Sequence, residues 1–316
     1  MDNEQSLSIR AAWLAYVGGQ TQEQVAERLG VSRIKAQRLI AAATQSGMVK
    51  FFVEGVPAEC IALEERLAKA FGLQRCTVVP DLDDGADDSA GATRSLAVAA
   101  AQHLTRRLES GQVSTGGVGH GRTLAAMVER LPAMNQQSTR FVSLLGSLTR
   151  RSAANPYDLI AKLAERTGGE CYFMPVPFLA DSRADAQVLR AQRGVQHVLG
   201  LVRECQLCVV GVGELGANPQ LLRNHFVTPE ELQVLLQAGA VGEIAGCFVA
   251  ADGRPVDCEM NERAVGASLD DLRGRDVLAV AGGRDKADAI RAVLNTGLIT
   301  ELIVDETAAQ LLAPAA

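Results

Sequence analysis

Residues 113–131 of the chain read VSTGGVGHGRTLAAMVERL, which is a short apolar run, a glycine-rich loop and a segment with apolar residues at helical spacing. The pattern predicts a strand over Val113–Val118 and a helix over Leu124–Leu131. Glycine lets the backbone approach a ligand closely, and free N–H groups at a helix start favour anions or hydroxyl oxygens. The candidate ligand contacts in this loop are Gly119, His120, Gly121, Arg122 and Thr123. For His120 a purely structural role is the open alternative.

The same alternation of strand and helix runs from Arg75 to the end of the sequence. It indicates an α/β fold with a parallel sheet that carries helices on both faces. Ligands of such sheets bind at the carboxyl ends of the strands, where the strand-to-helix loops gather. The predicted strands are Cys76–Val79, Val113–Val118, Phe141–Leu145, Cys171–Val176, Leu207–Val212, Val277–Ala281 and Leu302–Val304.

Three further loops with glycine follow predicted strands. Their candidate ligand contacts are Gly146 and Ser147 with Asn155 beyond them, then Gly211 and Gly213, then Gly283 and Lys286. One glycine at a strand end serves the turn alone. Four such loops, two of them with basic residues at helix starts, indicate a polyhydroxylated or phosphorylated ligand. A solvated side chain is the alternative for Lys286, at the start of a helix predicted over Lys286–Leu294.

The first fifty residues carry a different pattern, with apolar residues at helical spacing in three short segments. Thr21 and Ser32 stand where helix N-caps belong, and Gly30 lies in the turn between the second and third segments. From Gly30 to Lys50 there are four basic residues and no acidic one, although the net charge of the chain is −6. The pattern predicts a helix-turn-helix, with a wing over Met48–Val53. The candidate DNA contacts are Ser32, Arg33, Lys35, Gln37 and Arg38.

The alternative for this segment is a plain three-helix bundle with solvated charges. The length of 316 residues exceeds an ordinary domain of about 100 to 200 residues. We therefore expect a helix-turn-helix domain over 1–55, a linker helix over 56–74 and an effector-binding domain over 75–316. The start shows no apolar leader and no apolar run approaches about 18 residues, so we expect a cytoplasmic protein without membrane contact. The seven cysteines are scattered, and we expect neither a metal nor a cofactor.

Three motifs are QEQVAERLGVSR at Gln22–Arg33, GAVGEI at Gly239–Ile244 and VAGGRDK at Val280–Lys286. Together they resemble the SorC/DeoR-type family of bacterial sugar-binding regulators, over essentially the whole chain. Two further stretches, VSLLGSLTR at Val142–Arg150 and MPVPF at Met174–Phe178, are similar to a subgroup that regulates sugar-alcohol catabolism.

The resemblance implies a C-terminal domain of the glucosamine-phosphate deaminase and ribose-phosphate isomerase type that senses an effector. By motif position, the effector would be surrounded by Gly121, Thr123, Gly146, Asn155, Glu243 and Lys286. Two departures bear on phosphate contacts: Leu145 stands where some members that bind sugar phosphates place an Arg, and Arg122 separates the Gly and Thr of the first loop. An uncharged polyol is therefore a candidate beside a sugar or a sugar phosphate.

We thus expect a transcriptional regulator of a carbohydrate or sugar-alcohol operon, a repressor or else an activator, with operator DNA and a small effector as partners. We also expect a homodimer or homotetramer, to which the linker helix around Leu63, Leu67 and Phe71 contributes. The competing hypothesis is an enzyme of the sugar-phosphate isomerase or deaminase kind with a DNA-binding head. It is disfavoured because no paired acid and base are recognisable in the loops.

Overall fold

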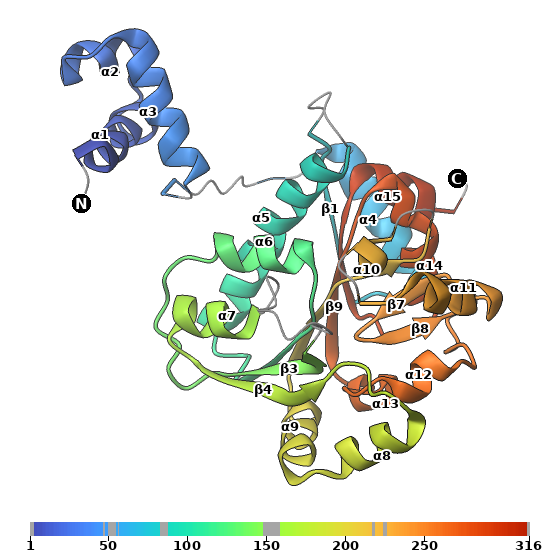
Figure 1. Ribbon diagram of the computed structural model, residues 1–316. Coiled ribbons are helices and arrows are strands. Elements are labelled where there is room, and N and C mark those ends of the chain that lie inside the picture. Colours follow the sequence, from blue (N-terminus) through green and yellow to red (C-terminus); the bar gives the residue numbers. More distant parts are fainter. Residues whose placement is uncertain are drawn as a thin grey trace. The chain divides into compact units, whose positions relative to one another are not determined.

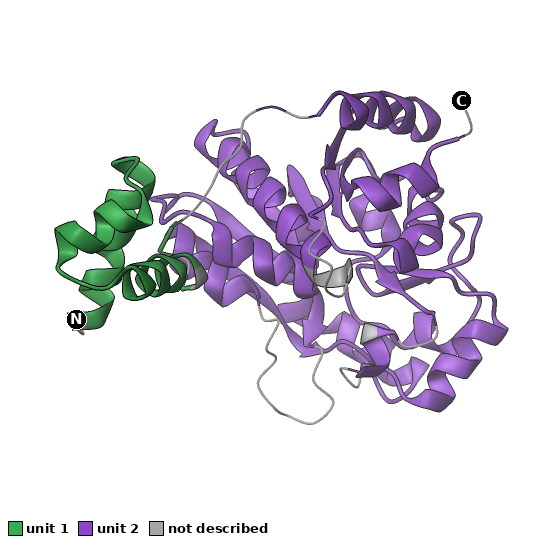
Figure 2. Ribbon diagram, turned by 90° about the horizontal axis from the view of Figure 1, so that it is seen from above, with its two compact units in different colours: residues 1–54 green, residues 55–316 purple. Residues whose placement is uncertain are grey.

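The computed structural model describes residues 3–46, 48–49, 55, 57–82, 88–147, 159–216, 219–223 and 226–314. Asn155 and residues 50–53 of the predicted wing lie outside the described residues. The chain divides into two compact units, Met1–Glu54 and Gly55–Ala316 (Figure 2). Within the described parts, none of the helices combines the length and the apolar character needed to cross a membrane.

The first unit is a helix-turn-helix. Its elements are α1 (Asn3–Ala12), a π-helical turn (Trp13–Val17), α2 (Gln22–Leu29) and α3 (Arg33–Gln45). A capping box starts α2, because Thr21 accepts a hydrogen bond from the backbone N–H of Gln24 and the Gln24 side chain accepts one from Thr21. Gly30 ends α2 with a φ of 64°, which favours glycine. The predicted helices and the glycine turn between them are confirmed.

This unit has a small core of its own. The buried residues that form this core are Ala11, Val25, Ala26, Ala36, Leu39 and Ile40. They come from α1, α2 and α3, so that the opposite face of α3 is left to the solvent.

The second unit is built on a seven-stranded sheet whose neighbouring strands are all parallel (Figure 1). In sheet order the strands are β1 (Arg75–Val79), β10 (Glu301–Asp305), β9 (Asp276–Val280), β5 (Leu207–Val210), β2 (Thr115–Val118), β3 (Arg140–Ser147) and β4 (Glu170–Pro177). They are the seven strands predicted from the apolar runs, and the α/β fold class is confirmed. Buried parallel strands read as continuous apolar runs, which is why the sequence locates them well.

The strand order changes direction between β2 and β5. From β2 the chain moves through β3 to β4 on one side, whereas β5 is followed by β9 and β10 on the other side. The carboxyl ends of β2 and β5 therefore flank a topological switch point, where parallel sheets bind their ligands.

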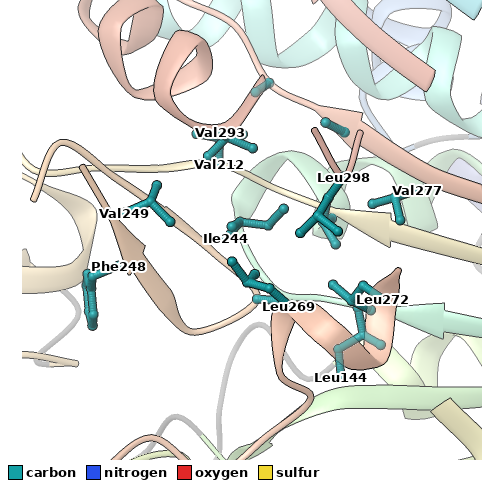
Figure 3. Close-up of a cluster of buried hydrophobic side chains, with 14 of the residues drawn as sticks. Leu144, Val212, Ile244, Phe248, Val249, Leu269, Leu272, Val277, Val293 and Leu298 are labelled. Carbon is teal, nitrogen blue, oxygen red and sulfur yellow. The ribbon is translucent and has the colours of Figure 1, made fainter. Parts of the chain in front are cut away.

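Helices cover both faces of this sheet (Figure 1). One face carries α5 (Asp88–Glu109), α6 (Arg122–Arg130) and α7 (Leu159–Thr167), whose apolar residues share one buried cluster with the strands. The other face carries α4 (Ala58–Phe71), α9 (Arg193–Arg203), α13 (Leu269–Leu272), α14 (Ala287–Leu294) and α15 (Glu306–Leu312). The remaining helices are α8 (Arg183–Ala191), α10 (Gln220–Arg223), α11 (Pro229–Gln237) and α12 (Glu259–Arg263). Part of the larger cluster is drawn in Figure 3, with Val277 of β9 and Val293 of α14.

A second, antiparallel sheet of three short strands was not predicted. It consists of β6 (Gly213–Glu214), β7 (Gly242–Ile244) and β8 (Cys247–Val249). These strands are two or three residues long, too short to show alternation in the sequence. The small sheet matters for function because β6 follows β5 closely and β7 carries the buried Glu243.

The helix predicted as a linker is α4, and its apolar side faces inward. Leu63 and Leu67 are buried in the core of the second unit, where α4 packs against β1 and α15. The side chains of these two leucines are covered by their own chain, whereas Phe71 is only partly buried, and the contribution of this helix to an oligomer stays a prediction.

Charged residues gather at the amino ends of β9 and β10. The switch point lies at the other, carboxyl ends of the strands. Glu301 is only 3% exposed, and His103 Nε2 lies 3.0 Å from its Oε2. Arg107 of α5 pairs with both Glu301 and Asp276, the latter at 2.6 Å. Burial opposes ionisation of Glu301, but the contact with His103 and the guanidinium groups of Arg107 and Arg75 hold its pKa below the usual value.

Candidate functional site

A small pocket of about 60 Å³ lies at the switch point. It is formed by the segments that follow β2, β5 and β9, together with β7. Its lining is made of His120, Gly121, Arg122, Thr123, Leu124, Gly211, Val212, Gly213, Glu214, Leu221, Phe226, Glu243, Val280 and Lys286. Eight of the residues predicted from the sequence are thus brought together from four distant segments: His120, Gly121, Arg122, Thr123, Gly211, Gly213, Glu243 and Lys286.

The start of α6 supplies hydrogen-bond donors to this pocket. Gly121 precedes the helix with a φ of 126°, and no side chain caps this helix end. The first bond inside the helix runs from the N–H of Ala125 to the carbonyl of Gly121. The N–H groups of Arg122, Thr123 and Leu124 therefore have no partner within the helix, and they favour ligand oxygens.

Lys286 reaches the pocket from the turn before α14. Residues Arg284–Lys286 form a 3₁₀ turn, and α14 begins one residue later at Ala287. Nζ of Lys286 donates a hydrogen bond of 3.0 Å to the carbonyl oxygen of Val212, and the side chain is half-buried. Burial lowers the pKa of Lys286, while the carboxylate of Glu214 counteracts part of that shift.

Glu243 is the most deeply buried acid of the pocket, with 3% of its surface exposed. Its Oε1 accepts a hydrogen bond of 2.6 Å from the backbone N–H of Gly246, in the turn between β7 and β8. Its Oε2 faces Gly213, where an added Cβ would lie only 2.5 Å from that oxygen. Gly213, proposed from the sequence as a ligand contact, thus also makes room for the carboxylate.

Glu214 was missed by the sequence analysis. Its Oε2 accepts a hydrogen bond from the N–H of Gly216, and the residue is paired with Gly242 across β6 and β7. An acidic residue directly after the glycine loop of β5 was the available signal. Phe226 was also missed, and its ring meets that of His120 edge to face, with the centroids 5.9 Å apart.

The other predicted contacts serve the backbone around the pocket. Gly119 donates a hydrogen bond to Val209, and Gly283, with a φ of 100°, donates one of 2.6 Å to Asp305. Gly146 lies in β3, where an added Cβ would lie 2.4 Å from the carbonyl oxygen of Val176. Ser147, at the end of β3, accepts a hydrogen bond from Phe178. None of these four residues lines the pocket.

A larger cavity of about 400 Å³ lies beside the turn between β7 and β8. Of the predicted site residues that the structure describes, none lines it. The polar atoms of Asn261 in its wall are occupied by bonds to Phe248 and Val256. We therefore take the smaller pocket, where donors and acceptors converge, as the candidate site.

The second helix of the helix-turn-helix presents the predicted DNA contacts. Arg33, Lys35, Gln37 and Arg38 are all exposed on α3, and the first turn of the helix contains no acid. Ser32 is the N-cap, because its Oγ accepts the backbone N–H of Lys35.

The two units together have the features of one class of protein. A helix-turn-helix reads DNA, and a parallel-sheet unit with a pocket at its switch point binds a small molecule, so the chain has the architecture of a ligand-responsive regulator. Among the described residues, no group of three or more His, Cys, Asp or Glu side chains is placed to hold a metal ion.

Comparisons with known proteins define the family. A protein family described as "Putative sugar-binding domain" matches residues 56–313. The chain is 42% identical to the erythritol catabolism regulatory protein EryD of Brucella abortus, over 98% of this chain and 97% of that protein. It is 32% identical to the transcriptional regulator LsrR of Klebsiella pneumoniae, over 97% and 92% of the two chains. The full-length sorbitol operon regulator SorC of Klebsiella pneumoniae has the same fold, with a TM-score of 0.72, 22% identity and coverage of 99% and 100%.

The chain therefore belongs to the SorC/DeoR-type family of sugar-binding transcriptional regulators. It is a regulator of transcription and not an enzyme, which confirms the resemblance seen in the motifs. The narrower resemblance to regulators of sugar-alcohol catabolism agrees with the identity to EryD.

Proposed function

We propose that α3 binds operator DNA and that a small polyhydroxylated effector, held in the pocket at the switch point, changes the affinity for that operator. The observation that carries the proposal is the convergence of the α6 N-terminus, Lys286 and the buried Glu243 in one pocket. Neutral hydroxyl groups and phosphate oxygens both accept hydrogen bonds from such donors, so sugars, polyols and sugar phosphates belong to the effector class. Because the relative EryD is named for erythritol catabolism, four-carbon polyols are the first candidates.

On the DNA side, we propose that the exposed face of α3 enters the major groove. In this proposal Arg33, which is exposed, binds guanine bidentately or contacts phosphate, and Gln37, also exposed, binds adenine. Ser32, Lys35 and Arg38 would hold the phosphate backbone and fix the register of the helix.

The assembly that binds DNA is proposed to be a homodimer or a homotetramer. One helix-turn-helix contacts too little DNA for selective binding, and paired modules read half-sites about 34 to 36 Å apart. Since the partner of the helix-turn-helix is operator DNA, we place the protein in the cytoplasm.

The proposal is tested by measuring operator affinity with and without effector. The DNA upstream of the operon that carries this gene is titrated with the full chain, in the absence and in the presence of polyols, sugars and their phosphates. We expect at least one of these compounds to change the affinity by about 5- to 150-fold, the usual range of allosteric coupling. If the chain binds no DNA in that region, or if no polyhydroxylated compound changes its affinity, the proposal is wrong.

A further inference from the structure

The face of α3 that points away from the core carries a large apolar side chain. Residues three or four apart on a helix share a face, and the inward face of α3 is formed by Ala36, Leu39, Ile40 and Ala43, which are all buried. The opposite face is formed by Ile34, Gln37, Arg38 and Ala41, which are all exposed. In the sequence, either Ile34 or Ala36 could complete the apolar face. The structure buries Ala36 and leaves Ile34 outside.

Ile34 lies outside the core of the first unit. The residue is 72% exposed, which is more than any other large apolar residue in the described ranges. Single apolar residues are common on protein surfaces, but this one lies in the first turn of the helix that is proposed to read DNA. Helix propensity does not account for it, because a β-branched residue is a weaker helix former than Ala, Lys or Arg at an exposed position. Neither packing nor helix formation therefore explains an isoleucine here.

The surroundings of Ile34 favour nucleic acid as its partner. Arg33 and Lys35 are its neighbours in the chain, and Arg38 follows one turn later on the same face. The first turn of α3 contains no acidic residue. Three cations around one apolar side chain complement the phosphates that border a DNA groove, and they would hold α3 against the duplex with Ile34 between them.

An aliphatic side chain finds one kind of apolar partner on the base edges of the major groove. It has no hydrogen-bond donor or acceptor, so it gains nothing from a phosphate oxygen or from the polar edge of a base. Thymine carries a C5-methyl group in the major groove, and the other three bases of unmodified DNA have no methyl group there. The first residues of a recognition helix are the ones that reach the base edges. The position of Ile34 and its chemistry therefore point to the same contact.

We propose that Ile34 contacts the C5-methyl group of a thymine in the operator and so makes operator affinity depend on that base. This inference rests on the proposed function, because it assumes that α3 enters the major groove. It adds an apolar contact to the polar contacts proposed for Arg33 and Gln37. Each half-site then contains a thymine that is recognised by its methyl group and not only by its hydrogen-bonding edge.

The test replaces the thymines of the operator by deoxyuridine, one position at a time. Deoxyuridine keeps the O4 acceptor and the pairing with adenine and lacks only the methyl group. Footprinting with the full chain first locates the operator upstream of the operon that carries this gene. We expect one position in each half-site at which deoxyuridine weakens binding of the wild-type chain by about fourfold, the contribution of one buried methyl group.

Ile34→Ala shows whether Ile34 reads that methyl group. The variant should bind the thymine operator at least about fourfold more weakly than the wild type, and deoxyuridine at the identified position should weaken it no further. The slope of log affinity against log salt should stay unchanged, because no charge is removed. Ile34→Val keeps an aliphatic, β-branched side chain and should retain part of the preference for thymine.

Val188→Ala is the matched control, because it removes an exposed β-branched side chain from α8 in the second unit. Its affinity for the thymine and the deoxyuridine duplexes should equal that of the wild type. Circular dichroism checks that α3 stays helical in the Ile34 variants, as expected for substitutions at an exposed position.

The outcomes separate this inference from the proposed function. If the wild-type chain binds the operator and no deoxyuridine replacement weakens binding, the inference is overturned while the proposed function stands. If deoxyuridine weakens the wild type and Ile34→Ala to the same extent, another residue reads the methyl group and the assignment to Ile34 is overturned. If the chain binds no DNA in that region, both the inference and the proposed function fail.

Discussion

At the level of single residues, Lys286 shows how a local turn decides where a side chain lies. The sequence placed this lysine in the first turn of a helix, where solvent exposure was an open alternative. In the structure, a 3₁₀ turn precedes α14, and the amine reaches the carbonyl of Val212 inside the pocket. The direction of a side chain depends on this local geometry, which residue periodicity does not reveal.

Replacement of Lys286 tests its part in effector binding. Lys286→Met removes the amine but keeps an unbranched chain. A ligand at about 100 times its dissociation constant adds roughly 2.7 kcal/mol to the free energy of unfolding. We expect a tenfold weaker variant to gain only about half of that, measured by thermal or denaturant unfolding with and without effector.

Arg284→Met is the matched control, because Arg284 is exposed in the same turn and lies outside the pocket lining. It should keep the full effector-dependent stabilisation. Operator affinity without effector should be unchanged in both variants. Full stabilisation of Lys286→Met by the effector would show that the amine makes no energetically useful contact with it.

Glu301 predicts a particular dependence of stability on pH. Its pKa is lowered in the folded state, so its stabilising contribution is fully present above the unfolded value of about 4.3 and is lost as the pH falls through the folded pKa. Glu301→Gln leaves Arg107 and His103 without this carboxylate and should cost about 3 kcal/mol at pH 7. When the pH is lowered from 5, the free energy of unfolding of the variant should also fall less than that of the wild type.

Denaturant titrations across that pH range measure both effects. Glu170→Gln, on the exposed start of β4, should stay within about 0.5 kcal/mol of the wild type. Parallel pH profiles for the wild type and Glu301→Gln would contradict the role given to Glu301.

At the level of elements, the sequence predicted best those strands whose side chains are buried on both faces of the sheet. Every strand of the parallel sheet was predicted, because runs such as that of β5 are apolar from end to end. The three strands of the small sheet were not, and β7 was visible only as part of the motif at Gly239–Ile244. Pairing between β6 and β7 is a tertiary event, so the position of Glu243 beside Gly213 could not be derived from either segment alone.

The residues of the candidate site were likewise predicted where a strong strand signal lies beside them. The glycine loops after β2, β5 and β9 were found because each directly follows a strong strand signal. Gly146 was assigned to the ligand by the same reasoning, but the structure packs it against the backbone of β4. A glycine that admits a ligand and a glycine that admits a neighbouring strand look alike in a sequence.

The recognition helix α3 yields a prediction for DNA binding. Arg33→Ala should weaken operator binding by about 1 to 3 kcal/mol and relax base preference if Arg33 reads guanine. If it contacts phosphate, the slope of log affinity against log salt should fall by about 0.9. Arg10→Ala, an exposed change on α1, serves as the control. Equal operator affinity of Arg33→Ala and the wild type at several salt concentrations would remove Arg33 from the interface.

At the level of the whole molecule, two units with separate cores imply that DNA binding and effector binding can be perturbed independently. Oligomerisation is the property that would join them in one assembly. We expect light scattering at micromolar concentration to give the mass of a dimer or a tetramer. The Leu67→Met variant should have the same mass, because Leu67 is buried in the core of its own chain. A monomer both with and without operator DNA would refute the expectation.

The pairing of β1 with β10 has a consequence for how the protein is made. β1 is an edge strand, and its neighbour in the sheet is β10. Arg75–Val79 therefore has no strand to pair with until Glu301–Asp305 has been made. During synthesis the first unit leaves the ribosome before the second and can fold on its own core, while the sheet stays open until Glu301–Asp305 has been made. A message cut short before codon 301 would therefore release a helix-turn-helix with an incomplete sensor. Such a fragment would carry a folded helix-turn-helix but no closed sheet with which to respond to an effector.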